Sequence, residues 1–228
     1  MESLPNGFTL ELRSGSFPLS TDSMVLSHFV SLPRSARVLD LGSGCATLGI
    51  ALCAKDGSCC VTGLEITESA HLAALDSIRR NNLSSRLTSI CRDLRNLPED
   101  FTGKFHCCVS NPPYFSGGPA SQSTPVARRD DFCPPEELFR AASRALQYGG
   151  DFYLVHKPEK LAQLCAEGTK AGLEPKRLRL VRHRADGPIA LILLGCRKGG
   201  KPGLLIDEMN LYHSDGTPTP DRRRIYHE

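Results

Sequence analysis

Long apolar runs are missing from this sequence of 228 residues. No stretch approaches the roughly 18–20 consecutive apolar residues that cross a bilayer, which excludes a membrane-spanning helix. Residues 1–13 lack the basic start and apolar stretch of a secretory signal, so we expect a cytoplasmic protein. Glycine and proline are scattered and no repeat is visible, which excludes a fibrous or low-complexity chain. What remains is a globular composition, 40% hydrophobic and 23% charged, that suits one large domain.

Closely spaced cysteine motifs are also missing, although the chain has ten cysteines. No C-x-x-C occurs, and zinc sites usually need such ligand pairs. Cys59–Cys60 and Cys107–Cys108 are adjacent pairs in apolar runs, where neighbouring side chains of a strand point to opposite faces. We therefore expect no metal site, and reduced cysteines that serve as small hydrophobic residues.

What the chain does have is an alternation of short apolar strands and amphipathic helices. The predicted strands are 37–41, 59–66, 87–91, 105–110, 152–155, 177–181 and 189–196, and the predicted helices are 46–55, 68–82, 135–146 and 159–171. Repeated strand–helix units indicate a parallel sheet with helices on both faces. The short turn at 186–188 joins the last two strands as an antiparallel hairpin. We predict an α/β fold with a doubly wound, mostly parallel, seven-stranded sheet that ends in this hairpin.

A glycine pair stands where the first predicted strand turns into a helix. Gly42 and Gly44 allow a tight turn and let a ligand approach the backbone closely. A dinucleotide site would have a third glycine, but Thr47 occupies that position. Asp40 would repel a pyrophosphate and instead suits a cation such as the ammonium of an amino acid. A turn with no ligand is the alternative interpretation.

Two more acidic residues follow the next two predicted strands. Glu65 can accept the hydroxyl hydrogens of a ribose, and Asp93 can reach an adenine amino group. Carboxyl ends of parallel strands meet at one end of a sheet, so Asp40, Glu65 and Asp93 together match S-adenosylmethionine. The residues that we assign to this cofactor are Asp40, Gly42, Ser43, Gly44, Glu65, Ile66, Asp93, Leu94 and Asn111.

Asn111-Pro112-Pro113-Tyr114, after the fourth predicted strand, is the most specific motif in the chain. Prolines have no N–H donor, so local carbonyls face outward without internal partners. The Asn111 oxygen and a proline carbonyl can both accept hydrogen bonds from one planar NH₂ group, which stabilises the charge that develops during methyl transfer. Tyr114 offers an aromatic face to a flipped-out base. We assign catalysis to these four residues; a proline-rich turn without chemistry is the alternative.

Together these motifs resemble those of class I S-adenosylmethionine-dependent methyltransferases that act on amino groups. The chain more closely resembles the bacterial family that methylates adenine N6 in valine tRNA beside the anticodon. Segments 18–23, 155–161, 172–177 and 199–202 carry the resemblance further, and it covers about residues 8 to 215. It implies that Ser20, Thr21 and Asp22 border the pocket, although Thr21 or Asp22 equally suits a helix cap.

The predicted organisation follows from this resemblance. Residues 1–35 form an N-terminal segment with a helix that packs on the cofactor site, 36–200 the catalytic domain, and 201–228 a C-terminal extension. We expect a monomer.

The motif at 111–114 does not choose among planar amines. Guanine N2 and a protein glutamine amide would also fit. However, glutamine enzymes carry a helical domain before the catalytic one, and guanine-N2 enzymes often carry a duplicated domain. DNA adenine enzymes need a target-recognition insert, for which the loop at 116–134 is short. RNA adenine N6 fits best, and a non-catalytic cofactor- or RNA-binding module is the alternative from another class.

Basic residues concentrate near the predicted hairpin. Residues 176–201 hold eight lysines and arginines against one acid, Asp186, while the whole chain has a net charge of only +3. Such a cluster can hold tRNA phosphates, or it can be a solvated sheet edge. The residues that we assign to the RNA substrate are Tyr114, Phe115, Arg128, Arg182, Arg184, Arg197 and Lys198.

Overall fold

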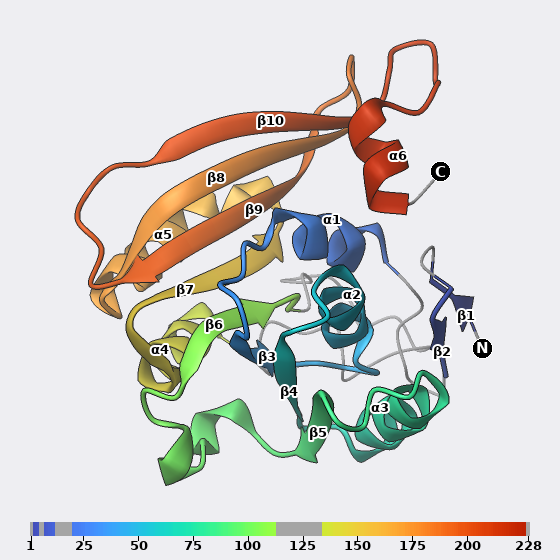
Figure 1. The fold of residues 1–228 in the computed structure, drawn as a ribbon. Helices are drawn as coiled ribbons and strands as arrows, with labels where there is room; N and C mark the ends of the chain where they lie inside the picture. The colour runs from blue at the N-terminus through green and yellow to red at the C-terminus, as the bar shows by residue number, and fades with distance from the viewer. Residues whose placement is uncertain (1, 5–6, 12–19, 113–133, 227–228) are drawn as a thin grey trace, which may run out of the picture.

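The computed structural model describes residues 2–4, 7–11, 20–112 and 134–226 (Figure 1). Its centre is an eight-stranded sheet in the order β10-β8-β9-β7-β6-β3-β4-β5. These strands are β3 (Arg37–Leu41), β4 (Cys60–Glu65), β5 (Leu87–Cys91), β6 (Phe105–Ser110), β7 (Leu146–His156), β8 (Leu173–Arg184), β9 (Ile189–Lys198) and β10 (Leu205–Tyr212). A separate pair consists of β1 (Glu2–Ser3) and β2 (Thr9–Leu10).

Helices cover both faces of the sheet. The helices are α1 (Thr21–Phe29), α2 (Thr47–Lys55), α3 (Glu68–Arg80), α4 (Pro135–Ala145), α5 (Leu161–Lys170) and α6 (Pro220–Tyr226), with 3₁₀ turns η1 (Leu94–Asn96), η2 (Glu99–Phe101) and η4 (Pro158–Lys160). Across the described ranges, no helix has the length and apolar character needed to span a membrane. In the same ranges, no three His, Cys, Asp or Glu side chains are grouped as a metal site.

The direction of the strands defines two ends of the sheet. Strands β5, β4, β3, β6 and β7 are parallel, β9 runs antiparallel to both β7 and β8, and β10 is parallel to β8. We call the end where β3, β4, β6 and β8 finish the carboxyl end, and the other, where β9 finishes, the amino end. The α/β class and the antiparallel hairpin are confirmed. The strand order reverses between β3 and β6, which is where open α/β sheets bind ligands.

The predicted number of seven strands is wrong, because β10 adds an eighth. This edge strand pairs with β8, with Leu205 opposite Arg177, and an ion pair of 2.6 Å joins Arg179 to Asp207. Leu205 and Ile206 are 75% and 61% exposed, so β10 has no alternation of buried and exposed residues at its start. Pairing with β8, rather than an apolar pattern of its own, makes this segment a strand.

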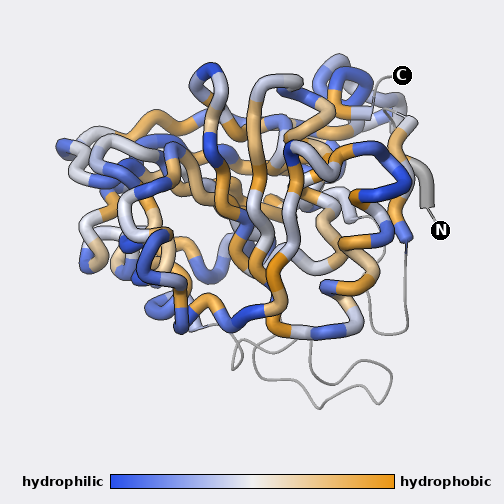
Figure 2. The backbone as a smooth tube through the Cα atoms, turned by 60° about the horizontal axis from the view of Figure 1, so that its bottom comes forward, coloured by the Kyte–Doolittle hydropathy of each residue, from blue (hydrophilic) through white to orange (hydrophobic). Residues whose placement is uncertain are grey.

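The core consists of two apolar layers, one on each face of the sheet. Figure 2 shows hydrophobic segments in orange along the backbone in the middle of the molecule. Val38 and Cys107 pack with residues of α1, α2 and α3, whereas Leu39 and Cys108 pack with α4 and α5. The adjacent pair Cys107–Cys108 therefore points to opposite faces, as predicted. Cysteines in the described ranges are free thiols.

The C-terminal helix α6 packs against β10 and α1. Ile225 is buried, and the Tyr226 hydroxyl donates to Thr21 Oγ1 at 3.3 Å. The described C-terminal residues thus contact the beginning of α1, which lies at the carboxyl end. The division of the chain at residues 35 and 200 stays a prediction.

Candidate functional site

The glycine loop after β3 is a tight turn held against β4. Gly42 and Gly44 have φ of +76° and +55°, a region that glycine adopts without the steric cost of a Cβ. The N–H groups of Gly42 and Ser43 both donate to the Leu64 carbonyl at 2.9 Å. Ala46 also has a positive φ, +69°, which costs about 1–2 kcal/mol for a residue with a Cβ. The predicted turn is present, with backbone strain at its junction with α2.

Glu65, at the end of β4, holds this loop. Its Oε2 accepts from the Gly44 N–H at 2.8 Å, and its Oε1 accepts from the Thr67 N–H at 2.7 Å. Only 9% of Glu65 is exposed. Because each carboxylate oxygen has a second lone pair, Glu65 can anchor the loop and still accept from a ligand.

Asp40 is the most unusual carboxylate in the described part of the chain. It is 1% exposed, and its Oδ2 has no hydrogen-bond partner among the described residues. Burial, and then repulsion from Glu65, raises the pKa of Asp40 to about 7. An unsatisfied buried polar group costs about 1–3 kcal/mol. Asp40 is therefore poised for a cationic partner.

Ser43 lies against β4 and also has an unsatisfied buried oxygen among the described residues. A Cβ at Gly63 would be 2.6 Å from Ser43 Oγ, so only glycine admits the loop at this position. Gly63 was not among the predicted site residues. Its signal was a glycine inside a predicted strand, which often marks a close approach of another segment.

Asp93, after β5, is engaged within the protein. It caps η1 by accepting from the Arg95 N–H at 2.9 Å, and the Arg95 guanidinium donates to both of its oxygens. Those hydrogen bonds lower the pKa of Asp93. Of the other residues assigned to the cofactor, Ile66 follows Glu65 and is 48% exposed, and Leu94 follows Asp93 and packs partly against the core. A contact of Asp93 with adenine stays a prediction.

Asn111 is positioned by two elements. Ser110 Oγ donates to the Leu41 carbonyl at 2.7 Å, which joins the ends of β6 and β3. Asn111 Nδ2 donates to Ser23 Oγ at 2.9 Å and to Ser20 Oγ at 3.4 Å. Ser20 is also the residue that caps α1, a role that the sequence suggested for Thr21 or Asp22. Ser23 was not among the predicted site residues. Pro113, Tyr114, Phe115 and Arg128 lie outside the described residues.

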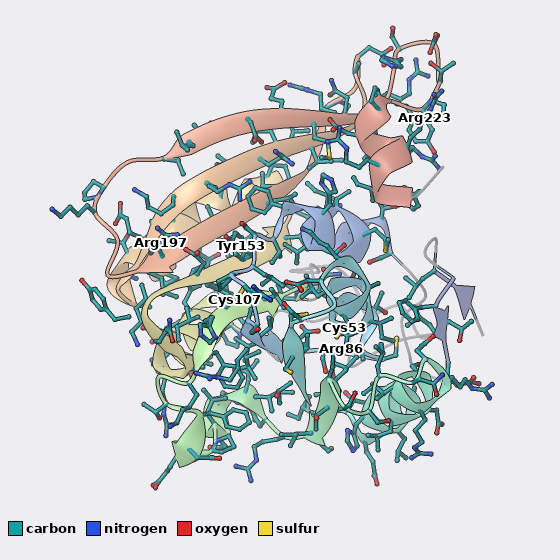
Figure 3. The ribbon with its side chains drawn as sticks, viewed as in Figure 1. Cys53, Arg86, Cys107, Tyr153, Arg197 and Arg223 are labelled. Carbon is teal, nitrogen blue, oxygen red and sulfur yellow. The ribbon has the colours of Figure 1, made fainter. Side chains whose placement is uncertain are left out.

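The four described residues assigned to RNA lie at opposite ends of the sheet. Arg182 and Arg184 stand at the carboxyl end, where they donate to the carbonyls of Gly187 and Ser214 and form ion pairs with Glu208 and Asp186. Arg197 and Lys198 stand at the amino end, and Arg197 pairs with Asp151. In Figure 3, Arg197 and Arg223, a residue of α6, mark these two ends. About 30 Å of strand separates the two pairs, so they do not form one patch.

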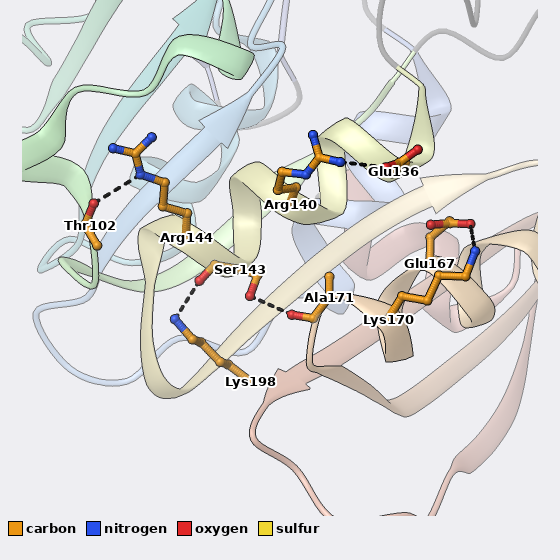
Figure 4. A pocket seen from close by; sticks show the side chains of 9 residues that line it. All are labelled: Thr102, Glu136, Arg140, Ser143, Arg144, Glu167, Lys170, Ala171 and Lys198. Atoms are coloured by element: carbon orange, nitrogen blue, oxygen red, sulfur yellow. Dashed lines mark hydrogen bonds and ion pairs between the residues drawn. The ribbon is translucent and has the colours of Figure 1, made fainter.

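A cavity of about 580 Å³ lies at the amino end, beside α4 and α5 (Figure 4). The charged residues that line it have partners within the protein. Arg140 pairs with Glu136, Lys170 pairs with Glu167, and Lys198 donates to the Ser143 carbonyl. Since these charges are already satisfied, the cavity is a weaker candidate for the site than the glycine loop.

Comparisons with known proteins identify relatives of this chain. Residues 20–166 match the family model described as "Methyltransferase small domain". A tRNA1(Val) (adenine(37)-N6)-methyltransferase of Bacteroides fragilis is 32% identical over 174 residues, which are 75% of this chain and 73% of the relative. One of the same name from Photobacterium profundum is 27% identical over 77% of this chain and 75% of its own length.

Solved structures show the fold. A predicted O-methyltransferase from Agrobacterium tumefaciens has a TM-score of 0.76 at 21% identity and covers 91% of this chain and 96% of its own. A geranyl diphosphate C-methyltransferase from Streptomyces coelicolor, solved with S-adenosyl-L-homocysteine, has a TM-score of 0.57 at 11% identity and covers 77% of this chain and 78% of its own. On these matches, the chain belongs to the methyltransferase small domain family.

Proposed function

We propose that this protein is an S-adenosylmethionine-dependent methyltransferase that acts on adenine N6 in tRNA. The observation that carries the proposal is the buried Asp40 carboxylate, whose Oδ2 lacks a partner among the described residues. It lies beside the glycine loop, at the point where the strand order reverses. The names of the curated relatives support adenine N6 in tRNA over the other planar amines.

The residues at the glycine loop fit S-adenosylmethionine. Asp40 suits its ammonium group, and the unsatisfied Ser43 hydroxyl offers a further polar contact. Glu65 has lone pairs left for the ribose hydroxyls. Ile66 offers an exposed apolar side chain beside Glu65. When bound, S-adenosylmethionine supplies an electrophilic methyl group.

Asn111 and Pro112 would hold the target amine. Their side-chain and backbone oxygens can accept the two hydrogens of an exocyclic NH₂, whose lone pair is otherwise delocalised into the ring. The lone pair of the nitrogen would accept the methyl group, and the nitrogen would then lose a proton to water. Oxygens already in place stabilise the positive charge that develops on the nitrogen. Tyr114 would stack on the base.

We place the tRNA body at the carboxyl end, on the side of Arg182 and Arg184. This is the end of the sheet that also carries Asn111. Phosphate contacts fix the position and orientation of a nucleic acid, so they work best near the reacting base. A role for Arg197 and Lys198, at the amino end, stays a prediction from the sequence. A tRNA substrate also implies a cytoplasmic place of action.

The test is mass spectrometry of nucleosides from unmodified tRNA incubated with the protein and S-adenosylmethionine labelled in its methyl group. Labelled N6-methyladenosine is the expected product, and the same reaction without protein is the control. Labelled N2-methylguanosine would move the proposal to another planar amine. A label found only on protein glutamine would overturn the RNA substrate, and no transfer at all would overturn the enzyme.

A further inference from the structure

Two serines of α1 hold one end of the Asn111 carboxamide. Asn111 Nδ2 is 2.9 Å from Ser23 Oγ and 3.4 Å from Ser20 Oγ. The Ser20 hydroxyl also donates to Ser23 Oγ at 3.4 Å. Ser23 is only 6% exposed, so water competes little for these contacts. The serines and the asparagine come from segments about 90 positions apart in the chain.

A backbone hydrogen bond at the start of α1 also fixes the positions of the two serines. Ser20 is the N-cap of α1, and its Oγ accepts from the Ser23 N–H at 3.3 Å. Ser23 therefore lies in the first turn of α1. Its backbone N–H donates to the Ser20 hydroxyl, which also contacts Asn111. The hydrogen bond that caps α1 and the hydrogen bonds that hold the Asn111 side chain therefore form one network.

The contacts of Asn111 with the two serines matter because a carboxamide has two chemically different ends. Rotation by 180° would exchange the NH₂ group for the oxygen and present a donor where an acceptor is needed. An NH₂ group facing the substrate amine could not accept its hydrogen bonds. In this orientation Nδ2, and not Oδ1, is the amide atom that contacts the serines.

We propose that Ser23 is a positioning residue for methyl transfer, which sets the orientation of the Asn111 amide with help from Ser20. The proposal rests on the proposed function, in which Asn111 Oδ1 accepts from the target amine. Ser23 itself does not touch the substrate. Its effect on the reaction passes through Asn111 alone.

The test compares two substitutions at Ser23. Ser23→Ala removes the hydroxyl, and we expect kcat to fall about ten-fold, equivalent to roughly 1.4 kcal/mol, while the Kd for S-adenosylmethionine stays the same. Ser23→Thr keeps a hydroxyl on the same carbon, and it should retain most of the activity. Equal kcat in the alanine variant and the parent protein would overturn the proposal, and so would an alanine-like kcat in a folded threonine variant.

Ser27→Ala is the matched control. Ser27 lies on the same helix, is 7% exposed, and donates to the Met24 carbonyl at 2.8 Å rather than to Asn111. Thermal unfolding of each variant reports any general loosening of α1. A loss of kcat in Ser27→Ala as large as in Ser23→Ala would mean that helix stability, and not orientation, is responsible.

A double-mutant cycle separates this proposal from the proposed function. Ser23→Ala should change kcat no further in an Asn111→Ala background, because the group that it orients is gone. Independent, additive losses would overturn the positioning role. If Asn111→Ala alone keeps full kcat, the proposed chemistry fails. If Asn111→Ala loses activity and Ser23→Ala does not, only the positioning role fails.

Discussion

The two ends of the sheet are both polar, but they differ in whether their polar groups are satisfied. At the carboxyl end, buried oxygens of Asp40 and Ser43 have no partner among the described residues. At the amino end, the cavity beside α4 and α5 is lined by charges that have partners, such as Arg140 with Glu136. A cavity full of charge is therefore not by itself a binding site. Missing partners distinguish a place prepared for a ligand from a well-paired surface.

The largest expected effect is on Asn111. Asn111→Ala removes an acceptor that matters mainly as charge develops, so kcat should fall about 100-fold or more while cofactor affinity stays nearly constant. Arg140→Ala, in the cavity at the amino end, is the control and should leave kcat unchanged. Steady-state kinetics and calorimetry measure both quantities. A fall in kcat in Arg140→Ala as large as in Asn111→Ala would contradict the proposed difference between the two ends of the sheet.

Glu65 tests the cofactor half of the carboxyl end. Glu65→Ala should weaken S-adenosylmethionine binding by about 1.5–3 kcal/mol, the range for hydrogen bonds to a charged group. The variant also loses the hydrogen bonds from the N–H groups of Gly44 and Thr67, which hold the glycine loop, and this loss adds to the weakening of binding. Calorimetry on the folded variant gives the answer, and unchanged affinity would remove Glu65 from the site.

The raised pKa of Asp40 predicts that the binding of S-adenosylmethionine depends on pH. Because its pKa in the folded protein is about 7, Asp40 holds a proton at lower pH and cannot pair with an ammonium group without losing it. Affinity for S-adenosylmethionine should rise by up to about ten-fold per pH unit as the pH approaches 7, and then level off. Asp40→Asn should flatten this rise. A rise that persists in Asp40→Asn would assign it to another group.

The same pKa shift affects stability in the opposite direction. The pKa is raised from 3.8 to about 7 on folding, so the folded protein binds more protons than the unfolded chain between these values. The contribution of Asp40 to the free energy of unfolding therefore decreases as pH rises from about 4 to 7. Comparison of urea unfolding of the parent protein and Asp40→Asn across this range measures the difference.

The smallest expected effect concerns the RNA surface. Replacement of Arg182 and Arg184 by glutamine should lower the salt slope of tRNA binding by up to about two units, one for each lost phosphate contact. The same change at Arg197 and Lys198 should leave it nearly unchanged. Filter binding over a series of salt concentrations compares the pairs, with thermal unfolding as the control for folding. A larger change for the second pair would move the tRNA to the amino end.

Much of the sheet was predictable because β3 and β6 are apolar and mostly buried, and the edge strand β5 alternates buried and exposed residues. The predicted strands at 37–41, 87–91 and 105–110 have the observed bounds of β3, β5 and β6. Strand β10 was not predicted, because its first residues are exposed and give no apolar pattern. It is a strand because it pairs with β8, which lies well before it in the sequence. The helix α6 was missed as well, since it is short and depends on its contacts with β10 and α1.

The candidate site divides in the same way. Asp40, the glycine loop and Glu65 are near one another because strand ends are ordered by the fold class, so the sequence places them. The partners of Asn111 were not predictable, because Ser23 lies 88 positions earlier and nothing in the sequence connects the two. The missing partner of Asp40 Oδ2 is likewise a property of three-dimensional packing.

The contact of Tyr226 with Thr21 spans 205 positions of the chain. At rates of protein synthesis of roughly 5–20 residues per second, about 10–40 seconds separate the appearance of these two residues. The first turn of α1, whose Ser23 contacts Asn111, therefore gains its contact with Tyr226 only after 205 further residues have been made. A nascent chain that has already made the glycine loop and Asn111 still lacks this contact, because Tyr226 follows both of them in the chain.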